Sequence, residues 1–239
     1  NGVIRTAFDR LANSPYPAAG IQLLNADRSL QPCGYYFVKG GLNLLLTLPY
    51  TGNLVRWLGQ RLKFRQPNIS ETTGITTVDW VMGAFLMVKR SAIERAGMMD
   101  EDFFLYAEEA EWCSRIRQEG PIAFYGDLNM VHFQGVSAAA GFQSADKSYN
   151  NLFDRKGKQL LLSNLVRIRK QYGIGWYWLM QCLLLAAIPV FFLGKLLTSW
   201  QKNNPYTWSH FGGYVRNVAG LMRYIPVITR NRSHFYKVL

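Results

Sequence analysis

Residues 97–135, GMMDEDFFLYAEEAEWCSRIRQEGPIAFYGDLNMVHFQG, contain an acidic loop, a helical pattern and a strand pattern in quick succession. Trp112 and Ile116 lie one turn apart, which predicts the buried face of a helix over 107–119 that stops at Gly120. The stretch LNMVHF that follows predicts a strand. These elements predict the α/β fold class, and packing alone rarely places so many acids at the start of one helix.

The acids and the histidine of this stretch each allow two interpretations. Glu108 and Glu109 occupy the first helical turn, where the helix dipole favours anions, and a carboxylate there is also a candidate general base. Glu111 precedes Arg115 by four residues, a spacing typical of a solvated surface ion pair. His132 follows the strand at its carboxyl end, where open α/β sheets gather ligands, and is either structural or a metal ligand.

The stretch VDWVMGAFLMVKR at 78–90 predicts a continuous strand that is buried on both faces. Asp79 interrupts its apolar start and either hydrogen-bonds the backbone at the strand end or contacts a ligand. Gly83 removes a side chain where another group can approach the backbone closely. At both positions we expect contacts other than core packing.

Further segments complete the predicted α/β region. GIQLLNAD at 20–27 predicts a short strand, and Ser91 with Glu94 predicts a capping box for a short helix ended by Gly97. Residues 39–77 mix Gly, Pro, Asn, Thr and Arg, so we expect a partly ordered excursion there. The opening stretch VIRTAFDRLAN is typical of the tail of a helix, and the chain starts without methionine, so we expect a fragment of a longer protein.

The formal net charge of +12 lies entirely in the last part of the chain. Residues 1–150 hold 14 of the 27 basic and 14 of the 15 acidic residues, whereas 151–239 hold 13 basic residues and one acid, Asp154. This split predicts two functional regions, 1–150 and 151–239. A basic region needs an anionic partner, which is either nucleic acid or a phospholipid surface.

The apolar content of the basic region favours the membrane. GIGWYWLMQCLLLAAIPVFFLG at 173–194 has no charged residue and is about as long as the roughly 20 residues that cross a bilayer. Its aromatic cluster at 176–178 lies beside basic residues, as in an interfacial belt. Gln181, Pro189 and basic residues on both flanks favour a re-entrant or in-plane arrangement over a span, and a buried helix of a soluble domain is the remaining alternative.

Three cysteines, Cys33, Cys113 and Cys182, lie far apart and have neither disulfide nor metal-site spacing. We expect Cys113 to pack within its helix and Cys182 to pack within the apolar run. A reduced, cytosolic setting fits this usage, and no amino-terminal signal peptide is visible.

Taken together, these segments resemble the carboxyl half of inverting family-2 glycosyltransferases, in particular the bacterial rhamnosyltransferase-like branch. The resemblance covers roughly 17–135, and its marks are GIQLLNADRSLQPCG, VDWVMGAFLMVKR, GMMDEDFFLYAEEAEW and VHFQG, in that order. It implies a partial GT-A, Rossmann-like domain at 1–150 that lacks its amino-terminal half, followed by a membrane-associated helical region at 151–239.

The resemblance also implies roles for individual residues. The family's general base matches Glu109, although Glu108 is a neighbouring candidate. His132 matches a histidine that in some members helps to hold a divalent cation, Mg²⁺ or Mn²⁺, which neutralises the leaving diphosphate. Positions that match the substrate and acceptor clefts or the acceptor-side loop of the family are Asp79, Trp80, Gly83, Ala84, Asp100 and Glu101.

The chain departs from the family by lacking its amino-terminal strands, its nucleotide-binding aspartate and a D-x-D-type metal motif, so we expect it to be inactive alone. No Q-x-x-R-W pattern follows the base, which argues against a processive synthase. The resemblance therefore implies transfer, with inversion, of one or a few sugars, rhamnose being a candidate. The donor is a nucleotide-sugar and the acceptor a lipid-linked glycan or polysaccharide of the cell envelope or capsule, at the cytoplasmic face of the bacterial inner membrane.

Two other function classes compete with the transferase. In a noncatalytic membrane-surface module, the acids would bind cations or a partner and the basic tail would bind lipid. The hypothesis of a nucleic-acid binder is supported only by the basic and aromatic residues of the tail. We therefore expect an anionic membrane and no nucleic acid as the partner.

Overall fold

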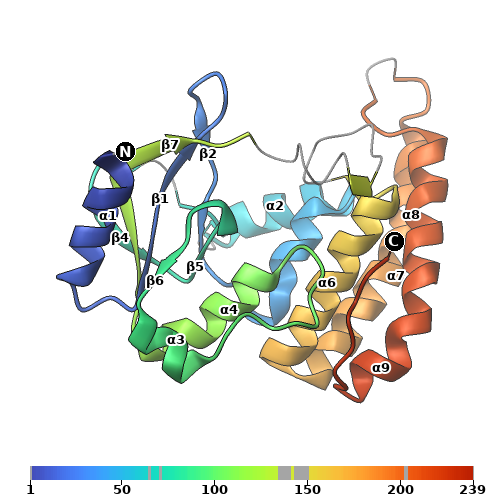
Figure 1. Ribbon diagram of the computed structural model, residues 1–239. Coiled ribbons are helices and arrows are strands. Elements are labelled where there is room, and N and C mark those ends of the chain that lie inside the picture. The colour runs from blue at the N-terminus through green and yellow to red at the C-terminus, as the bar shows by residue number, and fades with distance from the viewer. Residues whose placement is uncertain are drawn as a thin grey trace. The chain divides into compact units, whose positions relative to one another are not determined.

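The computed structural model describes residues 2–63, 66–69, 72–133, 141–142, 151–201 and 204–238 (Figure 1). The chain forms two compact units. The α/β unit consists of Asn1–Phe37, Gln66–Glu101 and Glu108–Gln134. The helical unit consists of Val38–Arg65, Asp102–Ala107 and Gly135–Leu239, so it includes two segments that precede residue 150. The functional division at residue 150 stays a prediction.

The α/β unit contains a mixed sheet in which β1 lies between β2 and β7, and β4 follows β7 (Figure 1). β1 runs parallel to β7, whereas β1 pairs antiparallel with β2 and β6, and β4 pairs antiparallel with β7. A second sheet joins β3 to β5. The strands are β1 (Ala18–Leu24), β2 (Leu30–Gln31), β3 (Gly34–Tyr35), β4 (Ile75–Val78), β5 (Trp80–Val81), β6 (Met87–Val88) and β7 (Ile122–Val131). The α/β fold class is confirmed, and the narrower GT-A fold stays a prediction.

β1 is the central strand and confirms the strand predicted at 20–27, shifted toward the amino terminus. All seven of its residues are buried, as in a strand covered on both faces. A Cβ on Gly20 would lie 2.6 Å from Val81, so only glycine permits this approach of β1 to β5.

The continuous strand predicted at 78–90 is wrong. Val78 ends β4 on the main sheet, β5 pairs with β3 in the second sheet, and β6 returns to pair with β1. Between β5 and β6 the chain forms the short 3-10 helix η2 (Gly83–Phe85). The apolar run is uninterrupted because each of its pieces packs on a different part of the same core, and hydrophobicity alone does not separate such pieces.

The helices of the α/β unit are α1 (Gly2–Ala12), α3 (Arg90–Ala96), α4 (Glu108–Ile116) and the 3-10 turn η3 (Arg117–Glu119). The predicted capping box is wrong, because α3 begins after Lys89 and has no side-chain cap hydrogen bond. Gly97 does end α3, with φ at 78°, and α4 with η3 confirms the helix predicted up to Gly120.

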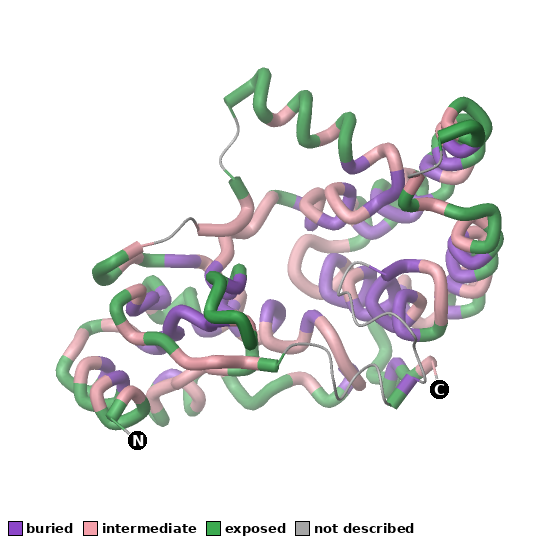
Figure 2. The backbone as a smooth tube through the Cα atoms, turned by 90° about the horizontal axis from the view of Figure 1, so that it is seen from above, coloured by how far each residue is buried: buried purple, intermediate pink, exposed green. Residues whose placement is uncertain are grey.

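In the stretch 39–77, Ile75–Val78 forms β4 of the α/β unit. In the helical unit, residues 39–63 are mostly helical and do not form the expected partly ordered excursion. This region holds η1 (Lys39–Thr47) and α2 (Thr51–Arg61). The other elements are α6 (Arg155–Tyr172), α7 (Ile174–Leu197), α8 (Trp208–Leu221), η4 (Met222–Tyr224) and α9 (Ile225–Thr229). Buried residues concentrate on α6 and along one face each of α7 and α8 (Figure 2).

Within the described residues, α7 is the helix long and apolar enough to cross a membrane by length and composition, and a third of its apolar window is buried. Tyr177, Leu184 and Phe191 are fully buried on its inner face. Its outer face exposes leucines, Trp178 and Phe192, and the exposed Cys182 corrects the expectation that this thiol packs inside. The helix therefore has one face in the core and one partly exposed apolar face, on which Phe192 contacts the rings of Trp208 and Phe211.

Candidate active site

The candidate site is centred on the start of α4, where Glu108 and Glu109 are the first two helical residues. The chain enters this helix through Tyr106 and Ala107, which both have positive φ, at 71° and 66°. Two consecutive non-glycine residues in the left-handed region are unfavourable, and strain of this kind clusters at functional sites. The free N–H groups and dipole of the first turn favour an anion there.

The structure brings Glu109 and Gly83 together. A Cβ built on Gly83 would lie 3.5 Å from Cβ and 4.0 Å from Cδ of Glu109. The glutamate side chain therefore extends over the bare backbone of η2. Gly83 itself is exposed, whereas Glu109 is half-buried.

An aromatic pair stands close to this contact. Tyr35 and Trp80 pair across β3 and β5 and stack with ring centroids 4.1 Å apart and planes 14° from parallel. Burial raises the pKa of the Tyr35 phenol above its ordinary value, and the charges of Cys33 and Glu109 add to this rise. The helix α4, which carries Glu109, packs against β5, which carries Trp80. Trp80 was predicted from the resemblance, but no sequence signal indicated Tyr35.

The two glutamates of the pair are shielded from water. The Oε2 atoms of Glu108 and Glu109 are both buried, and Oε2 of Glu108 has no hydrogen-bond partner among the described residues. Burial raises the pKa of the Glu108 carboxyl above its ordinary value of 4.5. Glu108 therefore holds its proton more tightly than a surface glutamate does.

Asp79 lies between β4 and β5, and its carboxylate makes the predicted hydrogen bond to the backbone. Its Oδ2 accepts a hydrogen bond from the backbone N–H of Phe37 at 2.7 Å. Its Oδ1 forms an ion pair with Arg117 at 2.8 Å. These contacts hold the junction of the two sheets, and the substrate-binding role of Asp79 stays a prediction.

Glu111 and Arg115 form a buried clamp, which corrects the expected solvated pair. Glu111 is only 6% exposed and accepts two hydrogen bonds from Arg115, at 2.9 and 2.8 Å. Arg115 also donates to the carbonyls of Ala96 and Met98. The pair therefore ties α4 to the end of α3, a function that the four-residue spacing alone could not reveal.

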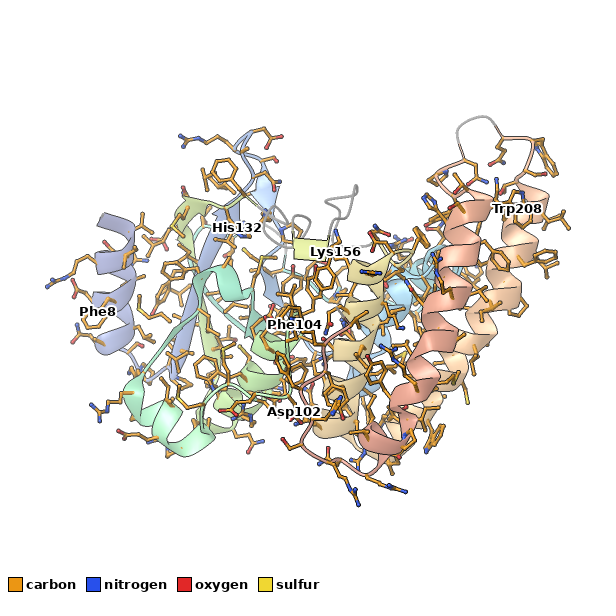
Figure 3. All side chains as sticks on the ribbon, turned by 45° about the vertical axis from the view of Figure 1, so that its right-hand side comes forward. Phe8, Asp102, Phe104, His132, Lys156 and Trp208 are labelled. Carbon is orange, nitrogen blue, oxygen red and sulfur yellow. The ribbon has the colours of Figure 1, made fainter. Side chains whose placement is uncertain are left out.

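His132 lies immediately after β7, as predicted (Figure 3). Its ring Nδ1 is 2.8 Å from Oε1 of Gln31, and its backbone N–H donates to the carbonyl of Leu24. Among the described residues, no group of three His, Cys, Asp or Glu side chains could hold a metal ion. The residues present around His132 therefore do not form a cation site by themselves.

The other predicted residues lie on connecting segments. Ala84 is exposed on η2, whereas Asp100 is half-buried and Glu101 exposed on the loop that follows α3. The structure thus gathers Gly83, Trp80 and Glu109 around one point. It leaves the remaining substrate-binding predictions untested.

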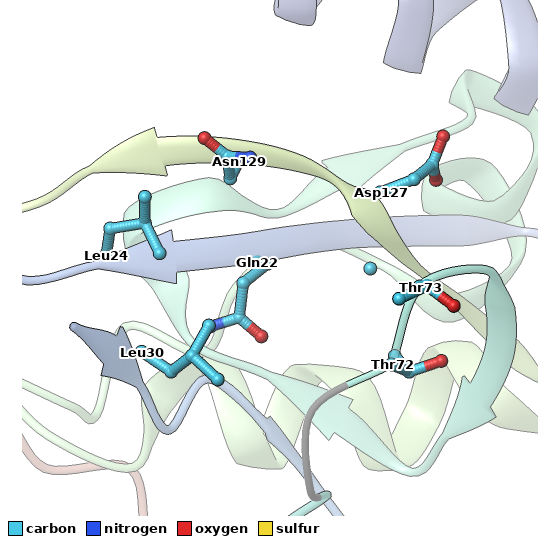
Figure 4. Close-up of a pocket in the computed structure, with 8 residues that line it drawn as sticks. Gln22, Leu24, Leu30, Thr72, Thr73, Asp127 and Asn129 are labelled. Atoms are coloured by element: carbon cyan, nitrogen blue, oxygen red, sulfur yellow. The ribbon is translucent and has the colours of Figure 1, made fainter. Parts of the chain in front are cut away.

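A shallow hollow of about 280 Å³ lies elsewhere in the α/β unit (Figure 4). None of the predicted site residues lines it. Its walls come from β1, β2, β7 and the segment before β4: Gln22, Leu24, Leu30, Thr72, Thr73, Gly126, Asp127 and Asn129. Asp127 is engaged by Arg10, which holds the pKa of this carboxyl below its ordinary value. We therefore centre the site on Glu109, where the chemistry-bearing residues meet.

Comparison with curated proteins finds similarity to the low-salt glycan biosynthesis hexosyltransferase Agl10 of Haloferax volcanii. The two sequences are 33% identical over 79 residues, which are 33% of this chain and 25% of that protein. No protein-family model matches the chain, and no solved structure matches it. Over one third of its length, the chain is thus similar to a glycosyltransferase of glycan biosynthesis, of which the match spans about a quarter.

Proposed function

We propose that this chain is the base-bearing part of a nonprocessive, inverting family-2 glycosyltransferase. In the complete enzyme, a nucleotide-sugar donates its sugar, with rhamnose as a candidate, to a lipid-linked glycan or polysaccharide. The similarity to a hexosyltransferase of glycan biosynthesis supports the class of reaction. Inactivity of the 239-residue chain alone stays a prediction.

The observation that carries the proposal is the position of Glu109. Its side chain lies against Gly83 beside the stacked Tyr35 and Trp80 rings, at the start of α4. A carboxylate next to an open backbone turn and a flat aromatic surface suits a base that must approach a sugar hydroxyl. A core-packing role would not require the bare backbone of Gly83 beside it.

In the proposed reaction, Glu109 accepts the proton of the acceptor hydroxyl as that oxygen attacks the anomeric carbon. The new glycosidic bond forms on one face while the bond to the nucleoside diphosphate breaks on the other, which inverts the configuration. Glu108, whose pKa is raised by burial, keeps its proposed role in substrate binding beside Glu109. Asp79, Trp80, Ala84, Asp100 and Glu101 keep their proposed roles around the substrates.

A divalent cation, Mg²⁺ or Mn²⁺, remains part of the proposal for the complete enzyme only. The surroundings of His132 do not supply a ligand set, because its Nδ1 faces the Gln31 side chain and no further metal ligands gather there among the described residues. We therefore assign no reaction step to a metal held by this chain.

The helical unit supports the proposed location on the cytoplasmic face of the bacterial inner membrane. It contains α7, whose outer face is apolar and exposed, and most of the basic residues of the chain. A lipid-linked acceptor would be met at such a surface.

The test is Glu109→Gln in the longer protein that contains this chain. The amide preserves size and most hydrogen bonding but cannot accept a proton, so we expect kcat to fall about 100- to 10,000-fold. Donor affinity, measured by calorimetry, should barely change. Sugar transfer would be followed with radiolabelled donor and a membrane fraction as acceptor.

Glu94→Gln is the matched control, because Glu94 is exposed on α3 and, in the described part of the chain, its ion pair is with the solvent-exposed Arg90. We expect its transfer rate to equal that of the unsubstituted enzyme. If Glu109→Gln retains full activity, the base assignment fails. If the complete protein binds membranes but never transfers sugar, the noncatalytic surface module is the better account.

A further inference from the structure

The helix α2 presents an apolar face that the described residues of the helical unit leave exposed. Leu54, Trp57, Leu58 and Leu62 follow helical spacing and are 43–61% exposed. The opposite side carries Asn53, Arg56, Gln60 and Lys63. Arg61 falls beside the apolar face, but its guanidinium stacks over the Trp57 ring at 4.8 Å.

This helix is attached at one end only. Gly52 is its one buried residue, and the backbone N–H of Gly52 donates to Leu48 at 2.8 Å while Arg56 donates to the carbonyl of Leu46 at 2.7 Å. The rest of α2 is exposed or half-buried (Figure 2). An 11-residue helix is marginal in water without packing of its apolar face, so a partner for that face would stabilise it.

The charge of the helical unit identifies the kind of partner. Its segments contain nineteen basic and three acidic residues, a formal net charge of +16, whereas the α/β unit contains eight basic and twelve acidic residues, a net charge of −4. Val38–Arg65 contains five basic residues and no acid. A leucine- and tryptophan-bearing face beside basic side chains matches an anionic lipid surface.

α2 is also tied to α7, the apolar helix of the same unit. Tyr50, just before α2, packs its ring against Gly194 of α7. A Cβ at Gly194 would lie only 2.6 Å from this ring. The Tyr50 hydroxyl is 2.7 Å from Oγ1 of Thr198, at the end of α7. Exposed leucines and Trp200, which is 73% exposed, surround this junction.

We propose that α2 is an in-plane membrane-docking helix that inserts Leu54, Trp57 and Leu58 into an anionic phospholipid surface. Arg61, beside Trp57, contacts the lipid phosphates, and the positive charge of the helical unit adds to the attraction. The docking element thus lies in the first third of the chain, outside the apolar segment at 173–194. This proposal does not rest on sugar transfer, because lipid binding requires no donor.

The test places a polarity-sensitive fluorophore on a single cysteine in the full chain. Cys182 is replaced by serine because it is exposed, whereas Cys33 and Cys113 are buried, and burial raises their thiol pKa values to about 11 and about 12, so they stay unreactive. Leu58→Cys carries the probe on the apolar face. Gln60→Cys is the matched control on the polar face of the same helix.

Vesicles of phosphatidylcholine mixed with phosphatidylglycerol are compared with vesicles of phosphatidylcholine alone. On the anionic vesicles we expect the Leu58→Cys probe to shift its emission to shorter wavelength and to be quenched by lipids brominated on the acyl chain. The emission wavelength of the Gln60→Cys probe should stay at its value in aqueous buffer. A donor-free assay of this kind reports on docking whatever the outcome for catalysis.

Three results would overturn the proposal. Equal responses at both positions would mean that α2 does not lie in the plane of the lipid surface. An equal response on phosphatidylcholine alone would remove the requirement for anionic lipid. A shift without vesicles that grows with protein concentration would identify a second copy of the chain as the partner of this face.

Discussion

Glu111 shows how much a neighbouring element changes the meaning of one residue. Its spacing from Arg115 predicts a solvated pair, yet the carboxylate is buried and Arg115 also holds the carbonyls of Ala96 and Met98. Glu111→Gln should therefore destabilise the α/β unit by about 1–3 kcal/mol, because it leaves a partly buried guanidinium without its anion. Urea unfolding measures this difference.

The control for Glu111 is Glu94→Gln. Glu94 and Arg90 have the same four-residue spacing, but both side chains are exposed, so the change should cost at most about 0.5 kcal/mol. Equal costs for the two substitutions would show that burial of the clamp contributes nothing.

Glu108 should make stability depend on pH. Burial raises the pKa of its carboxyl in the folded protein above the unfolded value near 4.5. Between these two pKa values the folded chain holds a proton that the unfolded chain has released, so stability falls as pH rises through this window. Below the unfolded pKa both states hold the proton, so burial of Glu108 costs no stability there.

Glu108→Gln removes the titrating group, so it should flatten that part of the pH profile and stabilise the protein at neutral pH relative to the parent. Unfolding by urea at a series of pH values from acidic to neutral measures the effect. A variant that loses stability as steeply as the parent would show that another group titrates.

At the scale of elements, α7 has two different faces. Phe191 is fully buried and contacts the rings of Tyr206, Phe211 and Tyr214, with centroids within 5.9 Å. Phe192, the next residue, is 43% exposed. The apolar run alone does not distinguish these neighbours.

Phe191→Ala should therefore destabilise the helical unit by about 3–5 kcal/mol, the usual cost of emptying a buried aromatic position. Phe192→Ala should cost less, about 0.5–1.5 kcal/mol, because the partly exposed Phe192 ring loses only its contacts with the Trp208 and Phe211 rings. Thermal unfolding of both variants in the same buffer gives the comparison. Similar losses would mean that α7 is packed on both faces.

At the scale of the whole molecule, two hydrophobic cores share no residue. One contains Ile21, Phe124 and Ile116 of the α/β unit, and the other contains Leu161, Phe191 and Tyr214 of the helical unit. Separate cores favour separate unfolding steps. Differential scanning calorimetry should therefore show two transitions.

The variants above assign these transitions. Glu111→Gln should lower the temperature of one transition, and Phe191→Ala should lower the other. A single transition that both variants shift equally would show that the two units unfold as one cooperative body.

The sequence by itself determined the α/β class, the strand at β1, the helix that carries Glu108 and Glu109, and the position of His132 after a strand. These features depend on local periodicity and on glycine stops, which act over a few residues. The sequence also located the excess of positive charge in residues 151–239, because the net charge of a segment is found by counting its residues. The family resemblance pointed to Gly83 and Trp80 as well.

Only the tertiary structure decided which of these residues meet. The run at 78–90 divides between two sheets. Its pieces all pack into the same hydrophobic core, so their apolar composition does not show where one strand ends and the next begins. Tyr35 reaches Trp80 through the pairing of β3 with β5, and Gln31 of β2 reaches His132 after β7. Contacts between residues so distant in sequence depend on packing geometry, which no local pattern encodes.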